Sequence, residues 1–516
     1  MVKGSLDLDT NYEQEEPFDR SKVPFWTSSR LGLAVLGFFG FVQLYALRVN
    51  MSVAIVCMVN HTAVKLMSEK TNQSSDSVEA SCAARLANTT SDIADGDNDW
   101  DKNIQGWVLG AFFWGYLVSQ IPAGWLATKI GGKRVLGWNM FAGAVLTLLT
   151  PVAANVSYIF LIVIRILLGL TSGVAFPAMH AMWGNWAPPL ERSKLTSFTY
   201  AGTQLGNAVT FPLAGFLCKY GFAAGWPSIF YVIGTLGLIW FVLWMFLVSD
   251  TPGQHKRISA IERKYIEYSL RESKHQESKP AVPWKAIFTS LPVYAIVVSN
   301  TTSDWGAYTL LINIPTYMKE VLKFDIASNG LYSALPYIGF WFCINVSGFM
   351  ADFVRKRNIL STTWTRRLFD AGGKVVPALL LIGLGYIDCT QPTVAIILLV
   401  LAVALTGPQY SGFTVNHVDL APAFAGILYG FSNSVASVSG FLSPLVSGAI
   451  TSKGQSRAEW QIVFYVAAGI YIFGAIFYIL FASGELQDWA KVEDDSKNDI
   501  ELKEPLKKNE NDVDHA

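Results

Sequence analysis

The sequence predicts an all-α polytopic membrane protein, with twelve transmembrane helices arranged in two six-helix bundles. The chain of 516 residues is 52% hydrophobic and only 15% charged, which is too apolar for an ordinary soluble protein. Apolar runs of about 20 residues, the length that crosses a hydrocarbon core roughly 30 Å thick, recur along the chain. They form two groups of six, separated by one polar segment.

The individual spans follow from the positions of these runs. The first group lies near residues 31–58, 104–126, 135–153, 157–181, 196–218 and 227–249, and the second near 289–312, 328–350, 368–387, 393–413, 425–449 and 462–483. The N-terminus has no basic, apolar and small-residue pattern typical of a cleaved signal, so we expect the first span to be retained.

The spans define five regions. A cytosolic N-terminal tail covers residues 1–29, and the N-terminal six-helix bundle covers 30–249. A cytosolic linker at 250–287 has apolar residues at helical spacing, which predicts a surface helix. The C-terminal six-helix bundle covers 288–484. The tail at 485–516 alternates in charge and has few aromatic residues, which predicts disorder.

Basic residues in the short loops predict the orientation. They fall after the second, fourth and eighth spans, and Lys and Arg are retained on the cytoplasmic side, so both termini are expected in the cytosol. The loop at 60–103 is then extracellular or lumenal, and its sequons at Asn72 and Asn88 are candidate glycosylation sites. The composition does not distinguish the plasma membrane from a lysosomal or vesicular membrane.

The cysteines do not follow a disulfide pattern. There are five, an odd number, scattered along the chain at Cys57, Cys82, Cys218, Cys343 and Cys389. Four of them lie in or beside apolar runs, which predicts buried small hydrophobic residues rather than a disulfide framework.

Several functional classes are excluded. The net charge is zero and no basic tract or zinc-type spacing is present, so no nucleic-acid partner is expected. The polar loops are short and poor in paired His, Cys or carboxylates, so we expect neither an enzyme nor a metal or other cofactor. No filter repeat typical of a channel is visible. The lipid bilayer and a small molecule remain as partners.

Two arginines lie inside apolar runs. Arg48 occurs in "LYALRVNMSVAIVCMVN" and Arg165 in "FLIVIRILLGL". A charge in mid-bilayer costs at least ~2.5 kcal/mol on insertion scales, so such residues usually face a cavity. A guanidinium can bind two oxygens of a carboxylate or phosphate, which predicts a small anionic substrate. The alternative is that either arginine snorkels or binds a helix-end carbonyl.

Other residues complete the predicted site. Tyr45 shares the face of Arg48, one helical turn away. Aromatic cavity walls are expected from Tyr45, Trp114, Tyr116, Tyr200 and Tyr308, although core packing is the alternative for each. Polar contacts from the second bundle are expected from Ser411 and Asn416, and candidate coupling or gating residues are His180, Asp304 and His417.

A short motif occurs twice, six spans apart. "GWLATKIGGKR" at 124–134 follows the second span, and "GFMADFVRKR" at 348–357 follows the eighth. The pair resembles the loop signature of the major facilitator superfamily, and therefore implies the major facilitator fold. In that family the acidic residue of the motif is part of an interbundle charge latch, which this resemblance assigns to Asp352.

Longer blocks resemble one branch of that superfamily. "YALRVNMSVAIVCMVN", "GWVLGAFFWGYLVSQIPAGWLATKIGGKR", "FPAMHAMWGNWAPPLERSKLTSFTYAGTQLG" and "GFTVNHVDLAPAFAGILYGFSNS" are similar to the anion transporter family of sialin, the vesicular glutamate transporters and the type I sodium/phosphate cotransporters. The resemblance covers residues 30–490. It implies substrate binding by Arg48 and Arg165, and a cavity lined by Tyr45, Tyr200 and Tyr308.

The function implied by the resemblance is secondary active transport. The substrate would be a small anion such as sialic acid, an acidic amino acid or inorganic phosphate, carried by alternating access. Transport would be coupled to H+ or Na+, or driven by the membrane potential. The alternative is an anion channel or an uncoupled facilitator.

One departure from this family concerns coupling. Sialin-like and vesicular glutamate members have glutamates in the fourth span, where this chain has Leu168 and Ser172. A transported proton needs a titratable carrier. His180 and Asp304 are the substitutes that the spans offer, and sodium coupling or potential-driven movement is the other interpretation.

Overall fold

The computed structural model describes residues 23, 25–60, 62, 96–223, 225–275, 282–324, 326–452 and 456–490. The regular structure in these ranges is helical, apart from an isolated β-bridge that joins Val59 and Asn98. The predicted sequons Asn72 and Asn88 lie outside the described residues.

The N-terminal bundle contains the six predicted spans. These are α1 (Ser29–Met58), α4 (Lys102–Ile130), α5 (Gly132–Val156), α6 (Tyr158–Ser172) continued by α7 (Ala175–Trp186), α8 (Pro189–Tyr220) and α9 (Trp226–Leu247). The fourth span is therefore broken, because Gly173 separates α6 from α7.

The C-terminal bundle has the same number of spans. These are α12 (Leu291–Glu320), α13 (Ile326–Lys356), α14 (Thr362–Leu384), α15 (Pro392–Ala404) continued by the π-helix η3 (Tyr410–Thr414) and α16 (Val415–Leu420), α17 (Ala425–Thr451) and α18 (Arg457–Phe481). The tenth span is irregular at η3, and π-helical segments are frequent at functional sites.

Short helices connect and flank the bundles. They are η2 (Pro252–Gln254), α10 (Ala260–His275), α11 (Trp284–Thr289), η4 (Pro422–Phe424) and η5 (Asp488–Ala490). The linker helix α10 is attached to the start of α1, because the Glu262 carboxylate accepts hydrogen bonds from the backbone N–H groups of Ser29, at 3.0 Å, and Arg30, at 3.1 Å.

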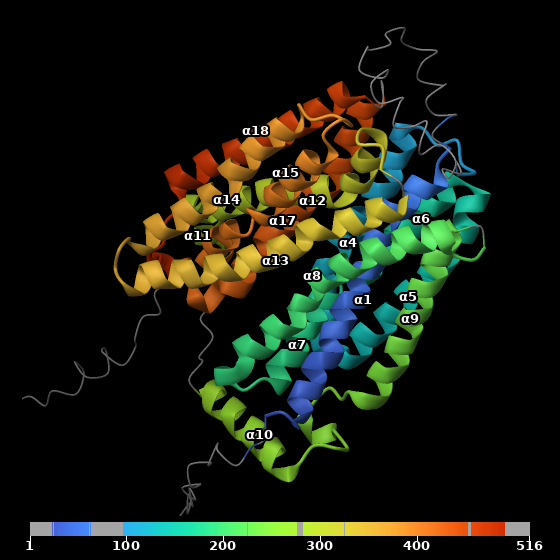
Figure 1. Ribbon diagram of the computed structural model, residues 1–516. Helices are drawn as coiled ribbons and strands as arrows, with labels where there is room; N and C mark the ends of the chain where they lie inside the picture. The colour runs from blue at the N-terminus through green and yellow to red at the C-terminus, as the bar shows by residue number, and fades with distance from the viewer. Residues whose placement is uncertain are drawn as a thin grey trace, which may run out of the picture.

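Among the described residues, the bundles contact each other most extensively through α8 with α13, α4 with α17, and α1 with α12. Figure 1 shows the bundles diverging toward the end of the molecule that carries α10 and α11. We call this the linker end, and we call the end at which α1 terminates and α4 begins the opposite end.

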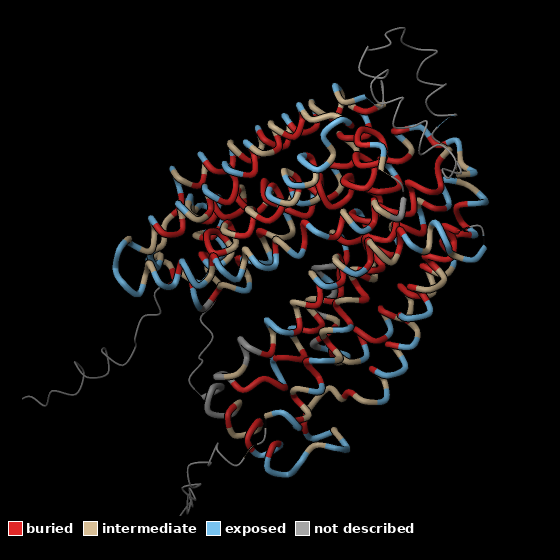
Figure 2. Tube along the Cα trace, in the orientation of Figure 1, coloured by how far each residue is buried: buried red, intermediate tan, exposed pale blue. Residues whose placement is uncertain are grey.

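The outer faces of the bundles are apolar. Phe246 is 83% exposed and Phe349 is 78% exposed, and exposed positions lie along the outer sides of the helices in Figure 2. Among the described residues, seven helices are long and apolar enough to cross a membrane. The other spans are more polar or are interrupted. For example, α14 includes Arg366, Asp370 and Lys374, and the tenth span is split by η3. An apolar exterior with polar groups inside is the arrangement expected of a polytopic membrane protein.

The cysteine prediction was wrong. Cys57 and Cys218 form a disulfide with a Cα–Cα distance of 6.5 Å, and Cys389 is also disulfide-bonded. Cys343 is free. The error has a simple cause: α1 and α8 pack in parallel, so their C-terminal ends meet although 161 positions separate the two cysteines.

Candidate substrate-binding site

Arg48 lies near the middle of α1 inside a cage of aromatic rings. Its guanidinium carbon is 4.9 to 5.4 Å from five ring centroids, which belong to Tyr45, Phe112, Phe113, Tyr116 and Tyr308. These rings come from α1, α4 and α12, so both bundles contribute. Cation–π contacts within about 6 Å are favourable, more so when the cation is desolvated. Arg48 is only 7% exposed, and the cage therefore stabilises a buried charge.

The hydrogen-bonding capacity of Arg48 is not used up. Its Nε and Nη2 atoms are buried and have no hydrogen-bond partner among the described residues. An unsatisfied buried donor costs about 1–3 kcal/mol, more for a charged group. Nε and Nη2 are thus the guanidinium donors that remain available to a bound anion.

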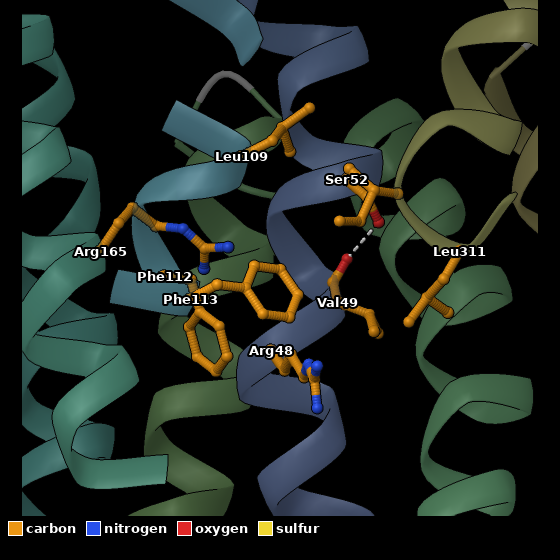
Figure 3. Close-up of a pocket in the computed structure, with 9 residues that line it drawn as sticks. Arg48, Val49, Ser52, Leu109, Phe112, Phe113, Arg165 and Leu311 are labelled. Atoms are coloured by element: carbon orange, nitrogen blue, oxygen red, sulfur yellow. Dashed lines mark hydrogen bonds between the residues drawn. The ribbon is translucent and has the colours of Figure 1, made fainter. Parts of the chain in front are cut away.

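Arg165 lies beside the same cage. It projects from α6 and is 3% exposed, and its guanidinium carbon is 5.2 Å from the Phe112 centroid. Nε donates a hydrogen bond to the Val108 carbonyl at 3.4 Å, while Nη1 has no partner among the described residues. Figure 3 shows Arg165 and Arg48 on either side of the phenyl rings of Phe112 and Phe113.

Glycines bring α6 close enough to α4 for this geometry. A Cβ atom on Gly115 would collide with the Ile166 carbonyl, and one on Gly169 would collide with the Phe112 carbonyl. Small residues at such positions allow transmembrane helices to approach closely. The approach places Arg165 against the backbone of α4.

The space between the two arginines is small. A cavity of about 10 Å³ is lined by Arg48, Val49, Ser52, Leu109, Phe112, Phe113, Arg165, Leu311 and Ile312. Such a volume holds about one water molecule. In this conformation a larger anion has no room between the arginines. Tyr308, which does not line this cavity, contacts the Arg48 guanidinium from α12.

Asp304 lies on the same side as Tyr308. It is half-buried on α12, one turn before Tyr308, and its carboxylate interacts electrostatically with Arg48. No hydrogen bond to the Asp304 carboxylate is found among the described residues. Asp304 is therefore the acidic residue beside Arg48, and the two arginines outnumber it.

His180 and Tyr200 form a second polar pair in the N-terminal bundle. The Tyr200 hydroxyl and the His180 Nδ1 are 2.9 Å apart, and the Tyr200 ring packs against Phe41 and Phe176. Tyr200 is thus placed next to His180 rather than in the cage around Arg48. His180 itself is exposed.

The polar candidates of the C-terminal bundle are engaged within that bundle. The Asn416 amide donates to the Tyr478 hydroxyl at 2.8 Å, and the Ser411 hydroxyl lies 3.2 Å from that of Ser347. His417 is 2% exposed, with Nε2 2.8 Å from the Ser432 hydroxyl. None of Ser411, Asn416 and His417 lines the cavity beside Arg48.

Asp352, the predicted latch residue, is exposed at the end of α13. The structure shows no ion pair for it among the described residues. Its role in a latch stays a prediction.

The opposite end carries polar links between the bundles that the sequence did not indicate. Lys102, at the start of α4, forms an ion pair with Glu320, at the end of α12, and both are almost fully buried. Lys319 Nζ donates to the Val56 carbonyl of α1 at 3.0 Å. Within the C-terminal bundle, the indole N–H of Trp460 donates to the other oxygen of Glu320 at 3.1 Å. These contacts close the opposite end.

Phe112 and Phe113 were also missed as cage residues. They lie in the run "AFFWGY", in which four of six residues are aromatic, so no periodicity distinguishes the ring that faces Arg48. Trp114, from the same run, is 46% exposed and packs against Phe441 with ring centroids 4.3 Å apart.

The fold and the site together define a two-bundle membrane transporter. The family model of the Major Facilitator Superfamily matches residues 33–444. Sialin from Homo sapiens is 47% identical over 468 residues, which are 91% of this chain and 92% of sialin. Vesicular glutamate transporter 3 from Danio rerio is 42% identical over 92% of this chain and 76% of its own length. The chain belongs to the Major Facilitator Superfamily, in the family that contains sialin and the vesicular glutamate transporters.

Solved structures show the same fold. A bacterial homologue of the human lysosomal transporter Spinster, in an inward-facing and occupied conformation, aligns with a TM-score of 0.63 at 13% identity over 88% of this chain and 96% of its own. The xylose transporter XylE from E. coli aligns with a TM-score of 0.61 at 14% identity over 88% and 96% of the two chains. These comparisons confirm the predicted fold class and the predicted family. The relatives are transporters, in agreement with the prediction that the chain is not an enzyme.

Proposed function

We propose that this protein transports small organic anions by alternating access, and that Arg48 binds the carboxylate of the substrate. The observation that carries the proposal is the pair of buried, unpartnered donors on Arg48 inside an aromatic cage. A guanidinium with free donors is suited to bidentate binding of a carboxylate, and phosphate is the related alternative. The names of the relatives, sialin and vesicular glutamate transporter, agree with substrates that contain a carboxylate.

Charge balance supports an anion. The formal charges of the two arginines, Arg48 and Arg165, and of Asp304 sum to +1. A monovalent anion brings this sum to zero. Neutralisation matters in a low-dielectric interior, where an uncompensated charge is costly.

The origin of the cage residues supports alternating access. Arg48 and Phe113 belong to the N-terminal bundle, and Tyr308 belongs to the C-terminal bundle. Rocking of one bundle against the other therefore changes the cage itself. The polar links join the bundles at the opposite end, whereas the helices of the two bundles diverge toward the linker end in Figure 1.

The orientation follows from the loop charges. We infer that the linker end faces the cytosol, with both termini on that side, because the basic loops lie there. The membrane is either the plasma membrane or a lysosomal or vesicular membrane. The proposed binding of the anion by Arg48 is the same in either membrane.

Coupling is proposed to use a proton. Leu168 and Ser172, where related transporters have glutamates, are buried, and the Ser172 hydroxyl donates to the Leu168 carbonyl at 2.9 Å. A proton carrier must therefore lie elsewhere in the chain than at these two positions. Sodium coupling and potential-driven movement are the alternatives that the experiment below tests.

Uptake into proteoliposomes tests the proposal. Sialic acid, glutamate, phosphate and urate are offered in turn under a pH gradient, a sodium gradient or an imposed potential. We expect uptake of at least one organic anion that Arg48→Gln abolishes, while Arg263→Gln, which removes an exposed arginine of α10, transports normally. Normal uptake by Arg48→Gln would contradict the proposal. Currents far above carrier turnover would instead support the channel alternative.

A further inference from the structure

The C-terminal bundle contains a second buried charge cluster, away from Arg48. Asp370 and Lys374 lie one turn apart on α14, and both side chains are 0% exposed. Lys374 Nζ is 2.5 Å from Asp370 Oδ1. Ser299, on α12, donates to the same oxygen at 2.7 Å and accepts from Lys374 at 2.7 Å. The three side chains form a closed triangle.

One oxygen of this cluster is left over. Asp370 Oδ2 is buried and has no hydrogen-bond partner among the described residues. An ionised carboxylate has about four acceptor sites across its two oxygens, and here only those of Oδ1 are engaged. The neighbouring Gln409 Oε1 is likewise buried without a described partner. A free carboxylate oxygen inside a bundle is an acceptor without a donor.

The cluster is pressed against the irregular part of the tenth span. A Cβ atom added to Gly412 of η3 would lie 2.7 Å from the Asp370 Cβ, and one added to Gly373 would lie 2.5 Å from the Gln409 backbone nitrogen. The Lys374 ammonium is also 5.2 Å from the Phe413 ring centroid. Movement of η3 therefore acts directly on Asp370 and Lys374.

The other charged and titratable groups nearby are already paired or neutral. Arg366, one turn before Asp370, is held by Asp419 at 2.6 Å, and Arg355 of α13 lies 4.0 Å from Asp419. From α18, Tyr478 accepts the hydrogen bond of Asn416. From the tenth span, Tyr410 packs against Phe413, and α15 has no titratable side chain. Lys374 is thus the charged partner that faces Asp370.

Stability alone does not account for such a pair. Desolvation of two buried charges can exceed their mutual attraction, and apolar replacements of similar size are often neutral or stabilising. Ionisable residues inside a membrane bundle usually serve the transported ion or substrate. This chain lacks the carboxylates of the fourth span, so a carboxylate in the other bundle with a free oxygen is available for that role.

We propose that Asp370 and Lys374 form a proton-binding site that couples anion transport to the pH gradient. The inference rests on the transport function proposed above. A proton from bulk water forms an O–H bond at Asp370 Oδ2, so the carboxyl becomes neutral while Lys374 keeps its ammonium charge beside Ser299. The cluster changes from net zero to +1, and the proton is carried together with the anion that Arg48 binds. The O–H bond breaks, and the proton returns to water on the other side, after the bundles have moved.

The test compares two variants. Asp370→Asn removes the proton acceptor but leaves Lys374 unpaired, so the protein can fail to fold. Asp370→Asn/Lys374→Met removes both charges together and preserves the packing. The matched control is Arg263→Gln/Glu267→Gln, which removes an ion pair of the same spacing from the exposed face of α10. All variants are reconstituted as the full chain.

Two activities are measured. Exchange of labelled for unlabelled anion at equal pH needs no net proton movement, whereas accumulation driven by a pH gradient does. We expect the double variant to exchange within about twofold of wild type, as tolerated removal of a buried pair implies. We expect it to lose accumulation and the proton uptake that a pH-sensitive dye reports, while the α10 control retains both.

Each other outcome contradicts the inference. If the double variant accumulates anion as well as wild type, the pair has only a structural role. The same conclusion follows if Asp370→Asn loses accumulation and the added Lys374→Met restores it. Loss of both exchange and accumulation in a folded double variant would also indicate a structural role for the pair. Wild-type accumulation that follows sodium and ignores pH would overturn the proton site but leave anion transport intact. Failure of the transport proposal looks different, because the wild-type protein would then exchange no anion.

Discussion

The guanidinium carbon of Arg48 lies 4.9 Å from the ring centroid of Tyr308, although the two residues belong to different bundles. Arg48 is in α1 and Tyr308 is in α12, and α1 and α12 pack against each other. The principal cation of the site is therefore held partly by the bundle that must move relative to it. Substrate binding and bundle movement act on the same contact.

The first prediction concerns Tyr308. Tyr308→Phe keeps the ring beside Arg48, so we expect an apparent affinity within a few-fold of wild type. Tyr308→Ala removes a desolvated cation–π contact of about 2 kcal/mol, which predicts weakening by roughly 30-fold. Anion-dependent thermal stabilisation of the purified protein measures the affinity. Tyr294→Ala, an exposed tyrosine of the same helix, is the control and is expected to be silent.

The second prediction concerns the shape of the cation. Arg48→Lys keeps a positive charge but replaces the planar fork by a point charge, and bidentate sites do not tolerate this exchange. We expect Arg48→Lys to lower the uptake of carboxylate substrates at least about tenfold. Substitution of a surface arginine should lower it less. Initial rates of uptake at several substrate concentrations give KM and maximal rate. Unchanged kinetics would mean that charge alone is recognised.

The third prediction concerns the ion pair of Lys102 and Glu320. Glu320→Gln removes the negative charge that joins α12 to α4, so the opposite end should open more often. Removal of one partner of a buried pair costs about 3–5 kcal/mol, enough to shift a two-state equilibrium. Asn313 lines the cavity next to Lys102, and a cysteine there reports access from that side.

The measurement is labelling of Asn313→Cys by a membrane-impermeant maleimide, in a Cys343→Ala background. We expect Glu320→Gln to accelerate labelling several-fold, because the barrier to opening falls. Glu267→Gln on α10 removes an equivalent charge from the exposed surface and should leave the rate unchanged. Equal rates in both variants would show that the ion pair does not control this end.

The fourth prediction concerns the disulfide of Cys57 and Cys218. It joins the ends of two parallel helices that are 161 positions apart, and a cross-link over a long loop typically contributes about 2–4 kcal/mol. Cys57→Ala/Cys218→Ala should therefore lower the apparent melting temperature. A scan by intrinsic fluorescence with and without reductant measures it. Reductant should lower the value for wild type and for Cys343→Ala by a similar amount, and should lower it less for the double variant.

Local properties of the chain were sufficient for the outline of the fold. An apolar run must cross the bilayer or be buried, and an arginine within it must face a cavity, whichever helices lie nearby. For that reason the twelve spans and the placement of Arg48 could be predicted. Helical spacing placed Tyr45 beside Arg48, and the family resemblance added Tyr308 to the site. The breaks in the fourth and tenth spans were not, because the close helix contacts beside Gly173 and Gly412 depend on neighbours from elsewhere in the chain.

The sequence by itself determined the protein class, the spans and the residue at the centre of the candidate site. Only the tertiary structure decided which partners these residues have. Phe112 and Phe113 face Arg48 because α6 and α1 flank α4, Tyr200 pairs with His180 instead, and Cys57 meets Cys218. Lys102 with Glu320, and Asp370 with Ser299, join helices far apart in the chain. The physical reason is that the free energy lost on burying a polar or charged side chain depends on that side chain, which the sequence shows. The hydrogen bonds and ion pairs that compensate it come from neighbouring helices, which only the tertiary structure shows.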